Sequence, residues 1–182
     1  MPPTMGLKGS AHAELIFENA VVPGTQLLGK LGEGLDIAFS FLEISRLAIA
    51  ASCLGLAQRF LELTIDFAKE RVTFGKAIAE RQAIQGMIAE MATEVYATRQ
   101  MISDAARKHD ENIAIPAEAS MCKLFALESL GRVSDNGIKV FGGIGYFRTH
   151  PIERMYRDAR ALWFEEGTPT IQKMVIARTL LK

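Results

Sequence analysis

A long proline-free stretch constrains this chain more than any other feature. Residues 35–70 are rich in apolar side chains, and within 47–67 these occupy nearly every face of a helix. A helix that is apolar on several sides is packed on several sides, so this one is predicted to be the central helix of a bundle. The most apolar run, residues 47–57, is bracketed by Arg46 and Arg59 and is too short to span a bilayer.

Further helical patterns follow along the chain. Residues 78–109 carry an apolar stripe at helical spacing, residues 117–141 carry another, and a last helix is predicted after Thr168. Four long helices joined by short connections indicate an all-α fold, an antiparallel four-helix bundle. The stripe of the second helix consists of Ile84, Met87, Ile88, Met91, Val95, Thr98 and Ile102.

The beginning of the chain follows a different pattern. Residues 13–22 partly alternate between apolar and polar side chains and end at Pro23-Gly24, which suggests strand material. A lone strand is marginal in water, so this segment is expected to be the end of a larger sheet. We therefore divide the chain into residues 1–32, the terminal strands of a β-domain, and residues 33–182, the helical bundle.

Composition excludes several functional classes. The 182 residues are 49% hydrophobic and 23% charged, and 21 Lys+Arg balance 21 Asp+Glu, which gives no electrostatic footprint for nucleic acid or an anionic membrane. Cys53 and Cys122 are far apart and the three histidines are scattered, so neither a disulfide nor a metal site is expected. No signal peptide precedes the first pattern, and the protein is predicted not to be secreted.

Three polar segments could carry chemistry. Glu166 and Gly167 precede Thr168-Pro169, a favourable helix start, so Glu166 is either a positioned base or an acidic residue at a helix N-terminus. The segment 71–76 offers a guanidinium, a hydroxyl and a glycine turn, which suit a phosphate oxygen or a plain polar turn. Gly142-Gly143 is either a helix stop or a close approach to a flat ligand.

Taken together, these motifs resemble the acyl-CoA dehydrogenase family. The resemblance covers essentially the whole chain and corresponds to the last strands of the family's middle β-domain and its C-terminal helical domain. The motifs that carry it are, in order, Met5-Gly6-Leu7-Lys8-Gly9-Ser10, Val22-Pro23, Leu27-Leu28-Gly29, Gly55-Leu56-Ala57-Gln58, Arg71-x-Thr73-Phe74-Gly75-Lys76, Gln82, Phe141-Gly142-Gly143-x-Gly145, Arg157-Asp158-Ala159 and Glu166-Gly167-Thr168.

The resemblance implies the α,β-dehydrogenation of an acyl-CoA thioester, a step of fatty acid metabolism, with FAD as cofactor. Glu166 would abstract the α-proton while the β-hydrogen leaves as hydride to FAD, and the backbone N–H at Glu166 would bind the thioester carbonyl. Some family members place the base at the position of Ser45, but a serine cannot serve as that base. Glu165 is expected to point elsewhere.

The resemblance also assigns the binding residues. Arg71 would contact the FAD pyrophosphate from a neighbouring subunit, and Lys139 stands where the family usually has glutamine. The residues implied for the flavin are Arg71, Thr73, Phe74, Gln82, Lys139, Gly142, Gly143, Thr168 and Thr170. Those implied for the acyl-CoA are Glu43, Ser45, Arg46 and Gly167. Without the resemblance, the polar residues of the 43–46 segment are explained equally well as a buried arginine and its ion-pair partner.

The expected partners are a second copy of the chain, in a homodimer or homotetramer, and an electron-transfer flavoprotein as acceptor. No nucleic acid and no membrane span are expected, and the compartment would be the bacterial or archaeal cytoplasm or the mitochondrial matrix. Two alternatives stay open: a truncated non-catalytic assembly bundle, and a flavin oxidase or monooxygenase relative. The isolated chain is expected to bind FAD weakly or not at all and to be inactive, yet still to self-associate.

Overall fold

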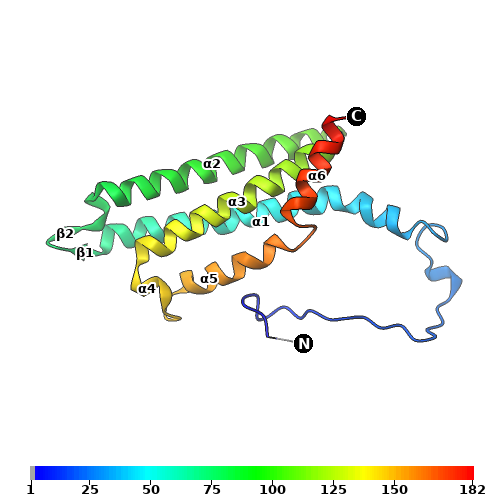
Figure 1. Cartoon of the computed structure of the whole chain (residues 1–182), viewed down its shortest axis with the longest axis horizontal. Coiled ribbons are helices and arrows are strands. Elements are labelled where there is room, and N and C mark those ends of the chain that lie inside the picture. Colours follow the sequence, from blue (N-terminus) through cyan, green and yellow to red (C-terminus); the bar gives the residue numbers. More distant parts are fainter. Residues whose placement is uncertain (1–2) are drawn as a thin grey trace.

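Three long helices dominate the computed structural model, which describes residues 3–182. They are α1 (Gly34–Glu70), α2 (Gln82–Asp110) and α3 (Pro116–Phe141). The helices lie side by side, with α2 antiparallel to both α1 and α3 (Figure 1). The predicted all-α bundle is confirmed.

Shorter elements precede, connect and follow the three long helices. They are η1 (Gly24–Gln26), β1 (Val72–Thr73), β2 (Lys76–Ala77), η2 (Ile78–Glu80), α4 (Gly143–Tyr146), α5 (Pro151–Ala159), η3 (Arg160–Trp163) and α6 (Pro169–Leu180). The fourth position of the bundle is therefore shared by α5, η3 and the 12-residue α6. The second helix begins at Gln82 rather than at residue 78, because a 3-10 turn and the extended Arg81 come first.

The core forms where α1 meets α2 and α3. Phe60, Met91 and Leu127 are fully buried there, and both cysteines are buried as expected. Gly137 lets α3 approach α1 closely, because a Cβ at this position would lie 3.0 Å from the Phe60 ring. Burying one such aromatic side chain contributes about 1.5–3 kcal/mol.

Helix α1 is also long and apolar enough to cross a membrane by length and composition. It has 37 residues and contains an 18-residue window of mean hydropathy 1.7, of which 22% is buried. Core helices of bundles have the same composition. The buried apolar residues of α1 between Ala50 and Leu61 belong to the main core, and its exposed apolar residues Leu35, Phe39 and Phe41 lie nearer its start.

A tight hairpin joins α1 to α2. Val72 pairs with Ala77 and Thr73 with Lys76, and the two turn residues, Phe74 and Gly75, have φ values of +50° and +81°. Positive φ at both central residues is typical of the turns that close two-residue hairpins. The sequence predicted the break in the helix here but not the two short strands.

The N-terminal segment differs from its prediction. Residues 13–22 form no strand, and Leu15 and Phe17 are 77% and 79% exposed. A strand needs a hydrogen-bonded neighbour, and the segment has none among the described residues. The division of the chain at residue 32 therefore stays a prediction. Residues 1 and 2 of the predicted first unit lie outside the described part of the chain.

Candidate functional site

Glu166 lies on a strained turn between η3 and α6. Its φ is +52° and that of Gly167 is +92°. Glycine adopts such angles freely, whereas a residue with a side chain pays about 1–2 kcal/mol. The predicted helix start follows, with Thr168 at the N-cap and Pro169 in the first turn, although the Thr168 hydroxyl makes no capping hydrogen bond.

Two buried polar side chains support this turn from inside the bundle. Lys123, on α3, is fully buried and its ammonium donates hydrogen bonds to the carbonyl oxygens of Glu165 and Gly167. Gln172, on α6, is also fully buried, and its Nε2 donates to the carbonyls of Glu166 and Gly167 at 3.1 Å each. Three consecutive carbonyls are thereby held toward the protein interior.

The Glu166 carboxylate is held from the other side by α1. The Ser45 hydroxyl, 121 residues away in sequence, donates a hydrogen bond to Glu166 Oε2 at 2.9 Å. Glu166 is half-buried and Ser45 is buried. According to the family resemblance, the catalytic base stands at the position of Glu166 or, in some members, at that of Ser45. These two residues are in direct contact here.

The neighbouring polar residues of α1 have different surroundings. Arg46 is 9% exposed, and burial lowers the pKa of its guanidinium, while the nearby carboxylates of Glu166 and Glu43 oppose that shift. The Arg46 Nε has no hydrogen-bond partner within residues 3–182. Glu43 Oε1 accepts from the Ile115 N–H at 2.7 Å, next to the start of α3. Glu43 therefore stabilises the start of α3, whereas the Arg46 Nε is left available for a ligand.

Sequence reasoning missed Lys123 and Gln172. The only sequence indication of Lys123 is its position beside Cys122 on the inward stripe of α3, where a charged residue is unusual. Burial and the like charge of Arg46 lower the pKa of the Lys123 amine, while Glu166 opposes the shift. We call Ser45, Arg46, Lys123, Glu166 and Gln172 the Glu166 cluster.

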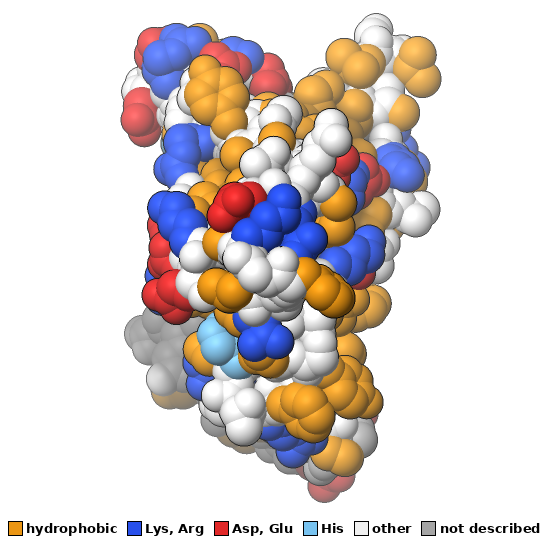
Figure 2. Space-filling view, turned by 90° about the vertical axis from the view of Figure 1, so that its left-hand side faces the viewer, with side chains coloured by type: hydrophobic (Ala, Val, Ile, Leu, Met, Phe, Trp, Pro, Cys, Tyr) orange, Lys and Arg blue, Asp and Glu red, His pale blue; other side chains and the backbone are white. Residues whose placement is uncertain are grey.

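Most of the residues predicted for the flavin lie elsewhere, at the hairpin end of the bundle. The hairpin cluster, defined as Arg71, Thr73, Phe74 and Gln82, surrounds the β1–β2 turn, and Lys139, Gly142 and Gly143 lie where α3 ends. Phe74 is 98% exposed, and Figure 2 shows Lys and Arg side chains interspersed with acidic and hydrophobic ones on the face seen from this end. Thr168 and Thr170 instead adjoin the Glu166 cluster.

Sequence reasoning also missed Arg81, which braces the hairpin. Its Nη2 donates to the Thr73 carbonyl at 2.5 Å and to the Thr73 hydroxyl at 3.2 Å, and its guanidinium lies 5.5 Å from the centre of the Phe74 ring. The Arg71 guanidinium, in contrast, has no side-chain hydrogen bond or ion pair within the described chain. Lys139 forms an ion pair with Asp135 at 2.6 Å.

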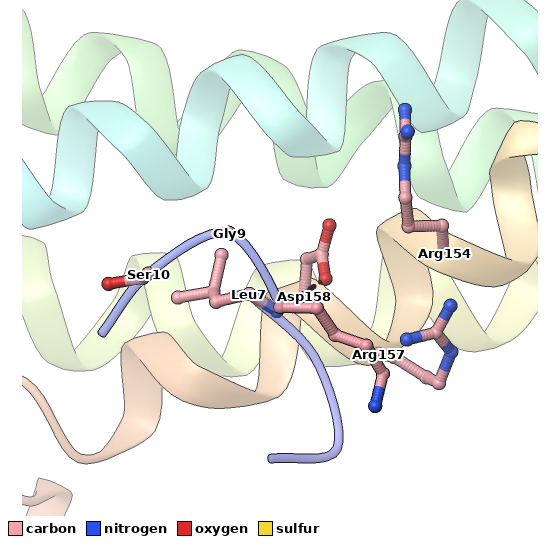
Figure 3. A pocket seen from close by; sticks show the side chains of 7 residues that line it. Leu7, Gly9, Ser10, Arg154, Arg157 and Asp158 are labelled. Atoms are coloured by element: carbon pink, nitrogen blue, oxygen red, sulfur yellow. Dashed lines mark hydrogen bonds between the residues drawn. The ribbon is translucent and has the colours of Figure 1, made fainter. Parts of the chain in front are cut away.

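A third contact joins the start of the chain to α5. The Leu7 N–H donates to Asp158 Oδ1 at 2.7 Å, and Arg157 donates to the Met5 carbonyl at 2.8 Å. A Cβ on Gly6 would lie 2.5 Å from the Arg157 carbonyl oxygen, so this close approach requires glycine. Beside the contact, residues 7–10 and Arg154, Arg157 and Asp158 of α5 line a cavity of about 680 Å³ (Figure 3).

Comparison with known proteins gives a consistent result. A family model described as "Acyl-CoA dehydrogenase, C-terminal domain" matches residues 32–181. The chain is 42% identical to "Acyl-CoA dehydrogenase" of Bacillus subtilis, covering 97% of the chain and 47% of that protein. It is 40% identical to "Caffeyl-CoA reductase-Etf complex subunit CarC" of Acetobacterium woodii, covering 98% and 47%.

A solved structure agrees with the sequence relatives. Butyryl-CoA dehydrogenase from Megasphaera elsdenii superimposes with a TM-score of 0.95 and 34% identity, over 98% of this chain and 47% of that one. The chain spans about half the length of the curated relatives it matches.

Proposed function

Because this chain belongs to the acyl-CoA dehydrogenase family, we propose that it forms the C-terminal helical part of an FAD-dependent enzyme that oxidises an acyl-CoA thioester between Cα and Cβ. The observation that carries the proposal is the placement of Glu166. Its carboxylate is fixed by Ser45 on a turn that is itself held by Lys123 and Gln172. A carboxylate positioned in this way suits the removal of a proton.

The chemistry requires a base and a polarised carbonyl. The α-proton of a thioester is weakly acidic, and it becomes easier to remove when the carbonyl oxygen receives hydrogen bonds. Glu166 supplies the carboxylate, and the N–H of the same residue donates no hydrogen bond within residues 3–182. One residue thereby offers both a proton acceptor and a donor for the thioester carbonyl.

The residues at the hairpin end fit a flavin nucleotide. Arg71 has an unpaired guanidinium for a pyrophosphate, and Phe74 offers an exposed ring for a flat ligand. Apart from the adjacent backbone, no atom of residues 3–182 would lie within 4 Å of a Cβ on Gly142 or Gly143, so a ligand can approach the backbone there. When bound, FAD supplies the acceptor for the hydride that leaves Cβ.

The distance between the two clusters supports assembly into dimers or tetramers. At about 1.5 Å of rise per helical residue, Ser45 and Arg71 are roughly 40 Å apart along α1, farther than the pyrophosphate of one flavin is from its ring. The hairpin cluster of one copy would therefore serve the Glu166 cluster of another. Exposed apolar side chains at the start of α1, among them Phe39 and Phe41, offer surface for such contacts.

We also propose an electron-transfer flavoprotein as the acceptor of the electrons. The name of the Acetobacterium woodii relative places that protein in a complex with Etf. A bacterial cytoplasm or a mitochondrial matrix fits the relatives, which include bacterial and mitochondrial proteins.

The test of this function is the substitution Glu166→Gln in a full-length enzyme that contains this chain. Glutamine keeps the size and hydrogen-bonding reach of the side chain but cannot accept the α-proton. The rate of flavin reduction by acyl-CoA is measured by stopped flow as the bleaching of the flavin absorbance. It should fall by about 10²–10⁴-fold, while acyl-CoA binding persists.

The matched control is Glu165→Gln, one residue earlier on the same turn. Its carbonyl, not its side chain, is bound by Lys123, so flavin reduction should change much less. A parent rate in Glu166→Gln, or a larger loss in Glu165→Gln, would show that the base is assigned to the wrong residue.

A further inference from the structure

We propose that Lys123 is a positioning residue that orients the Glu165–Glu166 peptide so that its N–H faces the substrate carbonyl. The proposal rests on the function proposed above and adds a residue outside the pocket to it. Lys123 reaches the site from α3, behind the turn, and its ammonium donates to the carbonyls of Glu165 and Gly167 rather than to the carboxylate of Glu166.

Peptide geometry gives Lys123 control over the direction of this N–H. In a planar trans peptide the C=O and the N–H point in opposite directions, and the described chain contains no cis peptide bond. The Lys123 ammonium holds the Glu165 carbonyl toward the interior of the bundle. The Glu166 N–H of the same peptide therefore points away from Lys123, out of the interior.

The second peptide of the turn is fixed in the same manner. Gln172 Nε2 holds the Glu166 carbonyl at 3.1 Å, and Lys123 and Gln172 share the carbonyl of Gly167. Both peptides that flank Glu166 are thus anchored from behind, which maintains its φ of +52° against the preference of a residue with a side chain. A cation on the Glu165 carbonyl also polarises that peptide and strengthens its N–H as a donor.

Core packing alone does not account for a lysine at this position. Lys123 is 0% exposed and has no carboxylate within 4.0 Å among residues 3–182. A fully buried lysine is rare unless it is paired, and a methionine would fill the same volume without a buried amine. What the lysine adds is a pair of hydrogen bonds to the carbonyls on either side of Glu166.

The test compares Lys123→Met and Lys123→Gln with the parent in the full-length enzyme. Two quantities are measured: the kcat and KM of dehydrogenation, and the infrared carbonyl stretch of a bound, carbonyl-labelled acyl-CoA that has no α-hydrogen. With methionine, kcat should fall about 10–100-fold with a smaller change in KM, and the stretch should move back toward its value in water. Glutamine should give an intermediate result.

Ser120→Ala is the matched control, because Ser120 is also fully buried on α3 and its hydroxyl has no partner within the described residues. It should leave both quantities at the parent value. The proposal is overturned if Lys123→Met folds with the parent kcat and carbonyl stretch. It is overturned equally if both Lys123 variants fail to fold and to retain flavin, since Lys123 would then act through stability alone. An inactive parent would instead contradict the proposed function itself.

Discussion

The two clusters of this chain differ in what holds them. The Glu166 cluster is braced from within: two buried side chains bind its carbonyls and a serine binds its carboxylate. Among the described side chains, only that of Arg81 supports the hairpin cluster, which leaves Phe74 almost fully exposed and the Arg71 guanidinium without a partner within residues 3–182. A site with internal support is ready for chemistry on its own residues, whereas a site that faces outward requires a ligand or another subunit to complete it.

Glycine substitutions at the two clusters should differ most in their effect on the free energy of unfolding. Gly167 and Gly75 both have positive φ, at +92° and +81°, but a Cβ on Gly167 would lie 3.1 Å from Gln172 Nε2, whereas one on Gly75 would meet nothing within 4 Å. Gly167→Ala should lower the free energy of unfolding by about 2–3 kcal/mol, the sum of backbone strain and crowding. Gly75→Ala should cost only the strain, about 1 kcal/mol.

Urea unfolding of the 182-residue chain measures both values, and flavin reduction in the full-length enzyme adds a second comparison. Gly167→Ala should also slow reduction, because it displaces the carbonyls that Lys123 and Gln172 bind. Equal losses of stability in the two variants would show that the Glu166 turn is no more tightly held than the hairpin.

Alkaline pH provides a second contrast, between the folded core, which buries both thiols, and the unfolded chain, which exposes them. Burial raises the pKa of Cys53 to about 12 and that of Cys122 to about 11, whereas a thiol in the unfolded chain titrates near 8.5–9. A pKa raised in the folded state gives stability that is complete below pH 8.5–9 and is lost as the pH rises through the folded value. The loss is about 1.4 kcal/mol per pH unit for each thiol.

The double variant Cys53→Ala with Cys122→Ala should be less stable than the parent at pH 7 and should lose less stability between pH 9 and 10.5. Lys123 is present in both proteins, and its lowered pKa acts in the opposite direction on the pH dependence of stability. Unfolding free energies measured at three pH values across this range provide the test. Parallel pH profiles would mean that the two thiols are not protected from solvent.

The smallest change in stability is expected at the hairpin cluster. Phe74→Ala removes an exposed ring, so the free energy of unfolding should stay within about 0.5 kcal/mol of the parent. In the full-length enzyme the same change should release FAD more readily during dialysis, as should Arg71→Ala. Gln100→Ala, on the exposed face of α2, is the control for both.

Flavin absorbance after dialysis measures the retained cofactor. Full retention in both hairpin variants would remove the hairpin from the proposed flavin site. A monomer of the isolated 182-residue chain should retain little FAD, because one copy places its hairpin and its Glu166 cluster far apart along α1.

Several elements could be predicted from local sequence. The stripe containing Met91, Val95 and Thr98 is buried as its spacing indicates, because helical periodicity depends on neighbours three and four residues away. The start of α6 at Pro169 is likewise a local property. The strand predicted for residues 13–22 did not form, since pairing depends on a neighbouring strand rather than on the segment itself.

The sequence by itself determined the long helices and the burial of the two thiols, and its resemblance to a known family made Glu166 the candidate base. Tertiary structure alone decided what holds that base. The Ser45 hydroxyl is 121 residues from Glu166, and no local spacing encodes their contact. Lys123 and Gln172 bind backbone carbonyls, which every residue carries, so nothing in the sequence identifies their partners. Only the packing of α3 and α6 around the turn directs these two side chains to those carbonyls.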